Sequence, residues 1–140
     1  MKRIIALIVC VVFCVCALTG CFGASKIKDL PGDAVQIETA EIEGYCGVSW
    51  NGREYMPYGT QNGTIYEKYI DRCVGWTGDD TNSRVYTLSG TDDYIAEYYV
   101  GGEMEQFRFL RALDTVGEDI DTPEYIASLD YELWTGIPQE

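Results

Sequence analysis

The sequence predicts an α+β fold, in which a small, mainly antiparallel β-sheet of about five to six strands carries one C-terminal amphipathic helix. Three observations lead to this prediction. Short runs of β-forming residues alternate with turn formers from residue 44 onward. Asn51-Gly52 separates two of these runs, which favours a β-hairpin. Thr122-Pro123 then opens a segment with apolar residues at helical spacing.

The hairpin is the first element of the predicted sheet. A two-residue type I′ turn needs a positive φ at both central residues, and Asn51-Gly52 suits that requirement. With this loop, Val48 faces Tyr55 and Trp50 faces Arg53. We therefore expect one apolar side on the hairpin, with a cation–π contact between Trp50 and Arg53.

The remaining strands are expected after a short helix or helical turn at residues 65–71. Alternation in the strongest of them puts Tyr94, Ala96 and Tyr98 on one face, opposite Ile95, Glu97 and Tyr99. Turn formers separate the four runs that we assign to strands, which are residues 73–77, 84–89, 94–100 and 107–113.

The predicted helix begins at Thr122, a good N-cap residue, followed by Pro123 at the first helical position. Glu124 lies in the first turn, where the helix dipole favours an anion. Gly136 and Pro138 would end the helix. The apolar stripe that it would bury on the sheet consists of Ile126, Leu129 and Leu133.

The N-terminal segment has the features of a secretory signal peptide. Lys2 and Arg3 precede an apolar run at residues 4–18, which is shorter than the ~20 residues that span a bilayer. The motif that ends it, Leu18-Thr19-Gly20-Cys21, resembles the lipobox of bacterial lipoproteins. This resemblance implies cleavage before Cys21 and attachment of lipid to that residue. We therefore expect a protein anchored by lipid to the cell membrane, on its extracytoplasmic side.

The chain then divides into a leader at residues 1–20, a lipidated cysteine with a tether at residues 21–43, and a single domain at residues 44–140. The tether is predicted from its small, polar and charged residues and from Pro31-Gly32. Its later part, Val35 to Ile37, has the composition to add a strand at an edge of the sheet.

The strong negative charge limits the classes of partner. The whole chain carries -13, and removal of Lys2 and Arg3 with the leader makes this -13 - 2 = -15. We expect no nucleic-acid partner, because binding nucleic acid requires Lys or Arg to neutralise many phosphates. Anionic headgroups should repel the domain, so acyl chains rather than a basic patch would hold it at the membrane. A basic protein partner would be attracted, although acidity also keeps an exported domain soluble.

Two cysteines remain after processing, because three of the six lie in the leader and Cys21 carries lipid. A disulfide between Cys46 and Cys73 would close a long loop and stabilise the fold by roughly 3–4 kcal/mol. The alternative is a pair of buried thiols.

Catalytic chemistry finds little support in the sequence. The chain contains no histidine, which removes Ser-His-Asp and Cys-His catalysis and imidazole-bound zinc. No Gly-rich phosphate loop precedes a helix, and we predict no cofactor and no enzyme. Acidic turns at residues 79–82, 92–93 and 118–121 carry oxygen ligands but lack the spacing of a known Ca²⁺ loop, so we predict no metal site.

Aromatic residues are the remaining feature, with 11 Tyr and 3 Trp. Most should fill the strands and core of a small sheet. Trp76 and Tyr99 are the candidates for an exposed binding surface, since such rings stack on sugars or anchor protein interfaces. We expect a non-catalytic module that binds a protein partner at the cell envelope, with glycan binding as the alternative and a small carboxylate enzyme as the third choice.

The stretch from Tyr94 to Thr115 is similar to small uncharacterised lipoproteins of bacterial surfaces. This resemblance agrees with the lipobox and implies no particular activity.

Overall fold

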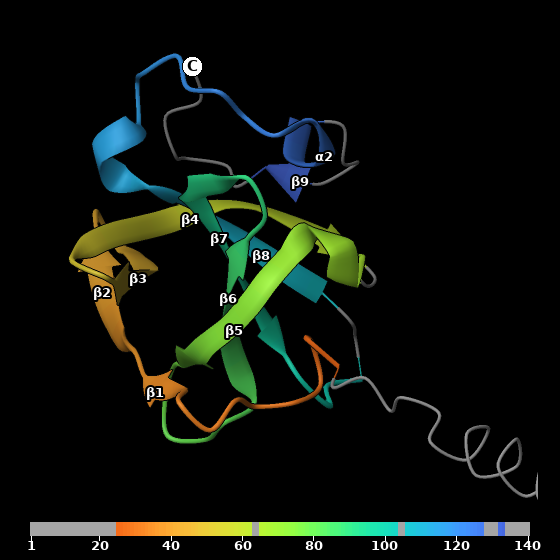
Figure 1. The fold of residues 1–140 in the computed structure, drawn as a ribbon. Helices are drawn as coiled ribbons and strands as arrows, with labels where there is room; N and C mark the ends of the chain where they lie inside the picture. The colour runs from red at the N-terminus through yellow and green to blue at the C-terminus, as the bar shows by residue number, and fades with distance from the viewer. Residues whose placement is uncertain (1–24, 63–64, 104–105, 128–131, 134–140) are drawn as a thin grey trace, which may run out of the picture.

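The structure is a computed structural model that describes residues 25–62, 65–103, 106–127 and 132–133. These residues form a nine-stranded sheet with short helical turns between strands (Figure 1). The elements in chain order are β1 (Val35–Gln36), β2 (Glu38–Ile42), β3 (Tyr45–Trp50), β4 (Arg53–Asn62), the 3-10 turn η1 (Glu67–Tyr69), β5 (Ile70–Trp76), β6 (Ser83–Leu88), β7 (Thr91–Tyr99), β8 (Gln106–Ala112), the 3-10 turn η2 (Leu113–Thr115), α2 (Glu124–Ala127) and β9 (Glu132–Leu133).

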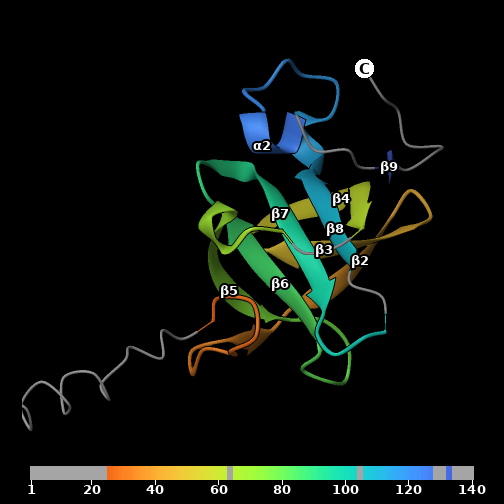
Figure 2. The ribbon, with the colours of Figure 1, turned by 90° about the vertical axis from the view of Figure 1, so that its right-hand side faces the viewer.

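The sheet curls into a nearly closed barrel. Its strand order is β1-β5-β6-β7-β8-β4-β3-β2, with β9 added to β4. β1 and β2 stand at opposite ends of this order, yet only Ile37 separates them in the chain. β1 pairs with β5 in parallel, and β2 pairs with β3 antiparallel. One extended segment, residues 35–42, therefore joins the two edges of the sheet (Figures 1 and 2).

The predicted α+β fold is wrong. The sheet has more strands than we expected, and the one α-helix in the described part of the chain is α2, with four residues. Helix formation does begin after Thr122-Pro123, and Ile126 is buried as predicted. However, Leu133 belongs to β9, which pairs with Gly59 and Thr60 of β4. β3 covers β4 only at residues 53–55, so the edge left open further along β4 can pair with another strand. Leu129 and the predicted helix end lie outside the described residues.

The hairpin prediction is confirmed in its register and its turn. Val48 pairs with Tyr55 and Trp50 pairs with Arg53. Both turn residues have positive φ, 51° for Asn51 and 77° for Gly52. The predicted cation–π partner was wrong in detail, because the Arg53 guanidinium lies over the ring of Tyr55, 5.8 Å from its centroid.

The four later strands are also found, as β5, β6, β7 and β8. β5 begins at Ile70, earlier than predicted, because the expected helix at residues 65–71 is only the short turn η1. The two faces of β7 are as predicted. Tyr94, Ala96 and Tyr98 belong to one apolar cluster, whereas Ile95 belongs to another.

These two clusters divide the core. The inner cluster fills the barrel with residues such as Val48, Val85 and Leu110, contributed by strands all around it. The outer cluster covers the outer face of β5–β8 and includes Tyr86, Tyr94, Phe107 and Phe109. Ile27, Ile65 and Ile126 from the connecting segments cover this outer face. A smaller third cluster joins Ile42 and Met56 to the η2 region.

The segment predicted as a tether belongs to the fold from residue 25 onward. Ile27, Ile37 and Ile42 are buried, each in a different cluster. Val35 and Gln36 add the strand that their composition allowed. The leader and Cys21 lie outside the described residues, within which no helix has the length and apolar character needed to cross a membrane.

Candidate binding site at the mouth of the barrel

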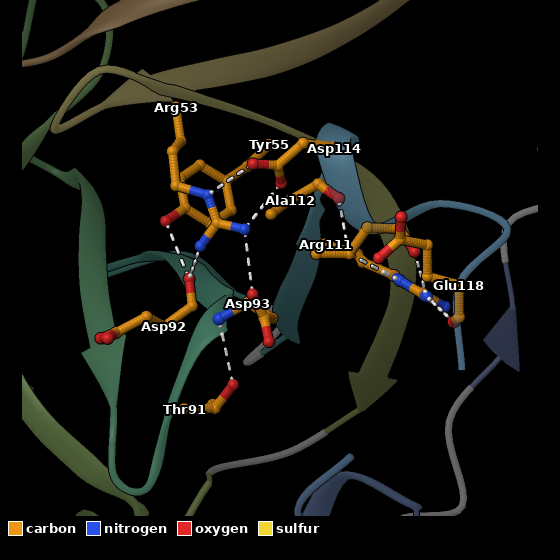
Figure 3. A network of polar contacts seen from close by, with 10 residues as sticks. Arg53, Tyr55, Thr91, Asp92, Asp93, Arg111, Ala112, Asp114 and Glu118 are labelled. Carbon is orange, nitrogen blue, oxygen red and sulfur yellow. Dashed lines mark hydrogen bonds and ion pairs between the residues drawn. The ribbon is translucent and has the colours of Figure 1, made fainter. Parts of the chain in front are cut away.

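Arg53 organises one end of the barrel. Its Nη2 and Nε donate to the two carboxylate oxygens of Asp114 at 2.6 and 3.2 Å, and Nη2 also reaches Asp93 at 2.9 Å. Its Nη1 donates to the backbone carbonyl of Asp92 at 2.9 Å. The guanidinium therefore ties the β3–β4 hairpin to the start of β7 and to η2 (Figure 3).

Arg53 and its two carboxylate partners stabilise one another in their charged forms. Hydrogen bonds from the guanidinium hold the pKa of Asp114 below its ordinary value, and the two carboxylates raise the pKa of Arg53. Burial raises the pKa of Tyr55, which keeps its hydroxyl protonated. That hydroxyl donates to the Asp92 carbonyl at 2.9 Å. The result is a fixed wall of charged and polar groups.

An acidic hollow of about 800 Å³ lies beside Arg53. Four carboxylates line it together with the single guanidinium, and Gly90, with a φ of 82°, allows the turn between β6 and β7 that forms one side. Asp93 shares Arg53 with Asp114, whereas the other three lining carboxylates have no cationic partner among the described residues. Those three are Asp71, Asp92 and Asp121, and all of them are exposed.

A second, smaller hollow adjoins the first. It measures about 230 Å³ and shares Arg53, Thr91 and Asp92 with the acidic hollow. Trp50 and Tyr55 supply its aromatic walls. We call the two hollows together the acidic mouth. Carboxylates next to aromatic faces suit a cation on an apolar stem, because the charge pairs with the carboxylates while the stem lies on the rings.

The carboxylates and aromatic walls of the acidic mouth have the chemistry that an organic cation needs. No group of three or more His, Cys, Asp or Glu side chains in the described chain is placed to hold a metal. Of the acidic turns singled out in the sequence, residues 92–93 and Asp121 line the hollow.

The opposite end of the barrel is closed by a different polar cluster. Thr77 and Ser83 donate through their hydroxyls to Oε1 of Glu97 at 2.6 and 3.0 Å. Arg108 pairs with the other oxygen of Glu97 and also donates to the carbonyl of Cys46 at 3.1 Å. Both carboxylate oxygens are therefore engaged within the protein, which leaves this cluster little capacity for a ligand.

The structure does not bring the predicted aromatic candidates together. Trp76 is paired with Arg84, whereas Tyr99 is paired with Ser83. Cross-strand partners share a face and neighbouring residues on a strand face opposite ways, so Trp76 and Tyr99 lie on opposite faces of the sheet. They cannot form one flat stacking platform.

The two cysteines considered for a disulfide are both free thiols in the structure. Cys46 is exposed on β3, and Cys73 is buried in the outer cluster on β5. Burial raises the pKa of the Cys73 thiol, which keeps it protonated at neutral pH.

Sequence reasoning missed most of the acidic mouth. Only Asp92-Asp93 and Asp121 were singled out, each within a separate acidic turn. Arg53 was interpreted as a neighbour of Trp50, although its two carboxylate partners lie 40 and 61 residues away in the chain. The comparison of the chain with protein-family models, with curated proteins and with solved structures gave no match. The proposal for its function therefore depends on the leader and on the geometry of this site.

Proposed function

We propose that this protein is a lipid-anchored, non-catalytic module of the cell envelope that binds a protein partner through a basic segment of that partner. One observation carries the binding part of the proposal. Three exposed carboxylates without a cationic partner among the described residues, Asp71, Asp92 and Asp121, line a hollow that adjoins an aromatic one. The anchoring part depends on the leader and on Cys21.

A lysine or arginine side chain of the partner can contact both the acidic hollow and the smaller aromatic hollow. Its charged group makes charge-assisted hydrogen bonds with the carboxylates, and arginine can do so with two parallel bonds. Its apolar stem then lies against Trp50 and Tyr55 in the smaller hollow. The net charge of the chain adds long-range attraction, which speeds association with a basic surface. Glycan binding has less support, because Trp76 and Tyr99 lie on opposite faces of the sheet.

Metabolic labelling tests the anchor. Cells that produce the full chain are grown with an alkyne analogue of palmitate, and the purified protein is examined for the label. We expect labelling of the parent and of the matched control Cys46→Ala, and loss of labelling in Cys21→Ala. Retention of the label by Cys21→Ala would overturn the proposed anchor.

Peptide binding tests the acidic mouth. A fluorescent peptide of alternating arginine and glycine is titrated with the parent and with Asp92→Asn/Asp121→Asn. We expect affinity to fall at least ~10-fold in this variant and to fall in the parent as salt is added. The control Glu54→Gln/Asp79→Asn removes the same charge from exposed positions outside the hollow and should change affinity by less than ~2-fold. An equal loss in both variants would show that only net charge matters.

A further inference from the structure

The described fold begins close to the residue that would carry the lipid. Ser25 is held in place, because its backbone N–H donates to Asp29 at 2.6 Å and its hydroxyl donates to Glu67 at 2.7 Å. Four residue steps separate Cys21 from Ser25, and a fully extended chain of that length spans at most ~14 Å. Whatever surface surrounds Ser25 must therefore lie near the bilayer in the anchored protein.

That surface carries an apolar groove of about 640 Å³. Ile27 and Ile65 form its floor, and Val100 and Gly101 border it after the end of β7. Tyr66 lines it as well and is 71% exposed. Tyrosine is enriched at membrane interfaces, because its ring is apolar and its hydroxyl remains hydrated.

The same surface holds every lysine that follows the leader. These are Lys26, Lys28 and Lys68, and all three are exposed. Lys28 lines the groove, and Lys26 donates to the carbonyl of Ile70 at 2.8 Å, next to η1. Lys68 lies over the ring of Tyr66, 5.5 Å from its centroid. We call these lysines, Tyr66 and the groove the lysine face.

The arginines that follow the leader are distributed differently. Each bonds to a carboxylate or a carbonyl of the protein: Arg53 with Asp93 and Asp114, Arg72 with Asp33, Arg84 with the Ile27 carbonyl, Arg108 with Glu97, and Arg111 with the Glu118 carbonyl. Among the described carboxylates, Asp29 and Glu67 accept hydrogen bonds from Ser25 on this surface, and Glu103 follows the groove residue Gly102 in the chain. On a mature chain that would carry -15, this is the surface on which all three lysines lie, and lysine side chains attract lipid phosphates.

We propose that the lysine face lies on the headgroup region of the phospholipid bilayer, so that the barrel rests on the membrane. The lysines meet lipid phosphates and Tyr66 enters the interface beside the groove. This inference rests on the proposed lipid anchor, and it replaces the expectation of a tether that holds the domain away from the membrane.

The groove and the acidic mouth lie toward opposite ends of β7. The groove follows the end of β7, at Tyr98 and Val100, whereas the acidic mouth lies at its start, at Thr91, Asp92 and Asp93. A strand of nine residues, such as β7, is about 27 Å long. The lysine face itself extends toward the mouth. Lys26 donates to the carbonyl of Ile70, next to Asp71 of the mouth, and Ser89 of the mouth donates to the carbonyl of Lys68 at 3.4 Å.

Energy transfer tests the orientation in the full acylated protein. A Cys46→Ser background carries a donor dye at Glu103→Cys, next to the lysine face, or at Glu54→Cys, an exposed glutamate on the far side of the barrel. The protein is placed in vesicles of phosphatidylcholine with phosphatidylglycerol and an acceptor dye on the headgroups. We expect transfer from position 103 to be at least ~2-fold more efficient than from position 54. Equal transfer from both positions would overturn the inference.

Charge reversal provides the second measurement. With the donor at position 103, Lys28→Glu/Lys68→Glu should reduce transfer to the level of position 54, whereas Lys28→Arg/Lys68→Arg should preserve it. Unchanged transfer in the reversed variant would also overturn the inference. A failure of the lipid anchor is distinguishable, because the protein would then not float with the vesicles at all.

Discussion

The two ends of the barrel each contain an arginine that bonds to carboxylate, yet they differ in what remains unpaired. At the closed end, Arg108 pairs with Glu97 alone, and two hydroxyls complete the bonding of that carboxylate. At the acidic mouth, Arg53 serves both Asp93 and Asp114, and Asp92 beside them has no cationic partner among the described residues. The first arrangement suits a structural role, whereas the second leaves negative charge available to a ligand.

The charged side chains are also more deeply buried at the closed end than at the acidic mouth. The side chains of Glu97 and Arg108 are 11% and 21% exposed, whereas that of Asp114 is 64% exposed. Interactions between charges weaken as water gains access to them. The comparison therefore predicts that stability depends mainly on the closed end and binding mainly on the mouth.

The largest expected effect is that of Glu97→Gln. It leaves the guanidinium of Arg108 inside the barrel end without its carboxylate, and we expect the free energy of unfolding to fall by about 3 kcal/mol. Denaturant unfolding measures the change. The exposed Glu54→Gln serves as the matched control, with a change below about 0.5 kcal/mol. A loss under about 1 kcal/mol for Glu97→Gln would remove the distinction between the two ends.

Gly75→Ala should have the next largest effect. A Cβ at this position would lie 2.0 Å from the carbonyl oxygen of Val35 and 2.9 Å from the side chain of Ile37. β1 must then move away from β5, and we expect a loss of roughly 2 kcal/mol in thermal unfolding. Gly32→Ala is the control, since nothing lies within 4 Å of its added Cβ. Equal melting temperatures for the two variants would mean that the contact between β1 and β5 contributes little.

Arg53→Gln should destabilise the fold less, by about 1 kcal/mol, because water reaches its side chain and those of its partners. The same denaturant experiment that is used for Glu97→Gln measures it. Should Arg53→Gln prove as costly as Glu97→Gln, the mouth would have to be regarded as a structural element like the closed end.

The smallest effect concerns acid pH. The pKa of Asp114 is lowered from its ordinary value of 3.8 by Arg53, so its ionisation stabilises the folded state. This contribution is fully present above the ordinary pKa and is lost as the pH falls through the lower, folded value. We expect the difference in stability between the parent and Arg53→Gln to shrink below about pH 4, as followed by denaturant midpoints. A constant difference down to about pH 2 would contradict the assignment.

Local rules predicted the parts of the fold that depend on neighbouring residues. Asn51-Gly52 determined the register of its hairpin, and alternation determined the faces of β7. Closure of the barrel had no such signal, because β1 pairs with a strand 75 - 35 = 40 residues away. The predicted helix was too long because the open edge of β4 pairs with residues 132–133, which no local pattern reveals.

The candidate site was harder to predict for a related reason. The ladder shifts register between Cys73 and Gly75, and such an irregularity decides which face Trp76 occupies. The acidic mouth likewise combines Asp71, Asp92 and Asp121, which stand far apart in the sequence. Nothing in the sequence distinguishes each of these residues from an ordinary solvent-exposed acid, because only the arrangement of the strands places them together.

The pairing of β1 with β5 also has a consequence for folding, because it joins segments far apart in the chain. Val35 is synthesised forty residues before Gly75, so β1 cannot pair with β5 until that later segment has been made. Pairings between such distant segments form slowly, because a long loop has to be ordered before they contribute. The hairpin and the run from β5 to β8 can assemble from local contacts, whereas the pairings of β4 with β8 and of β1 with β5 both join distant segments.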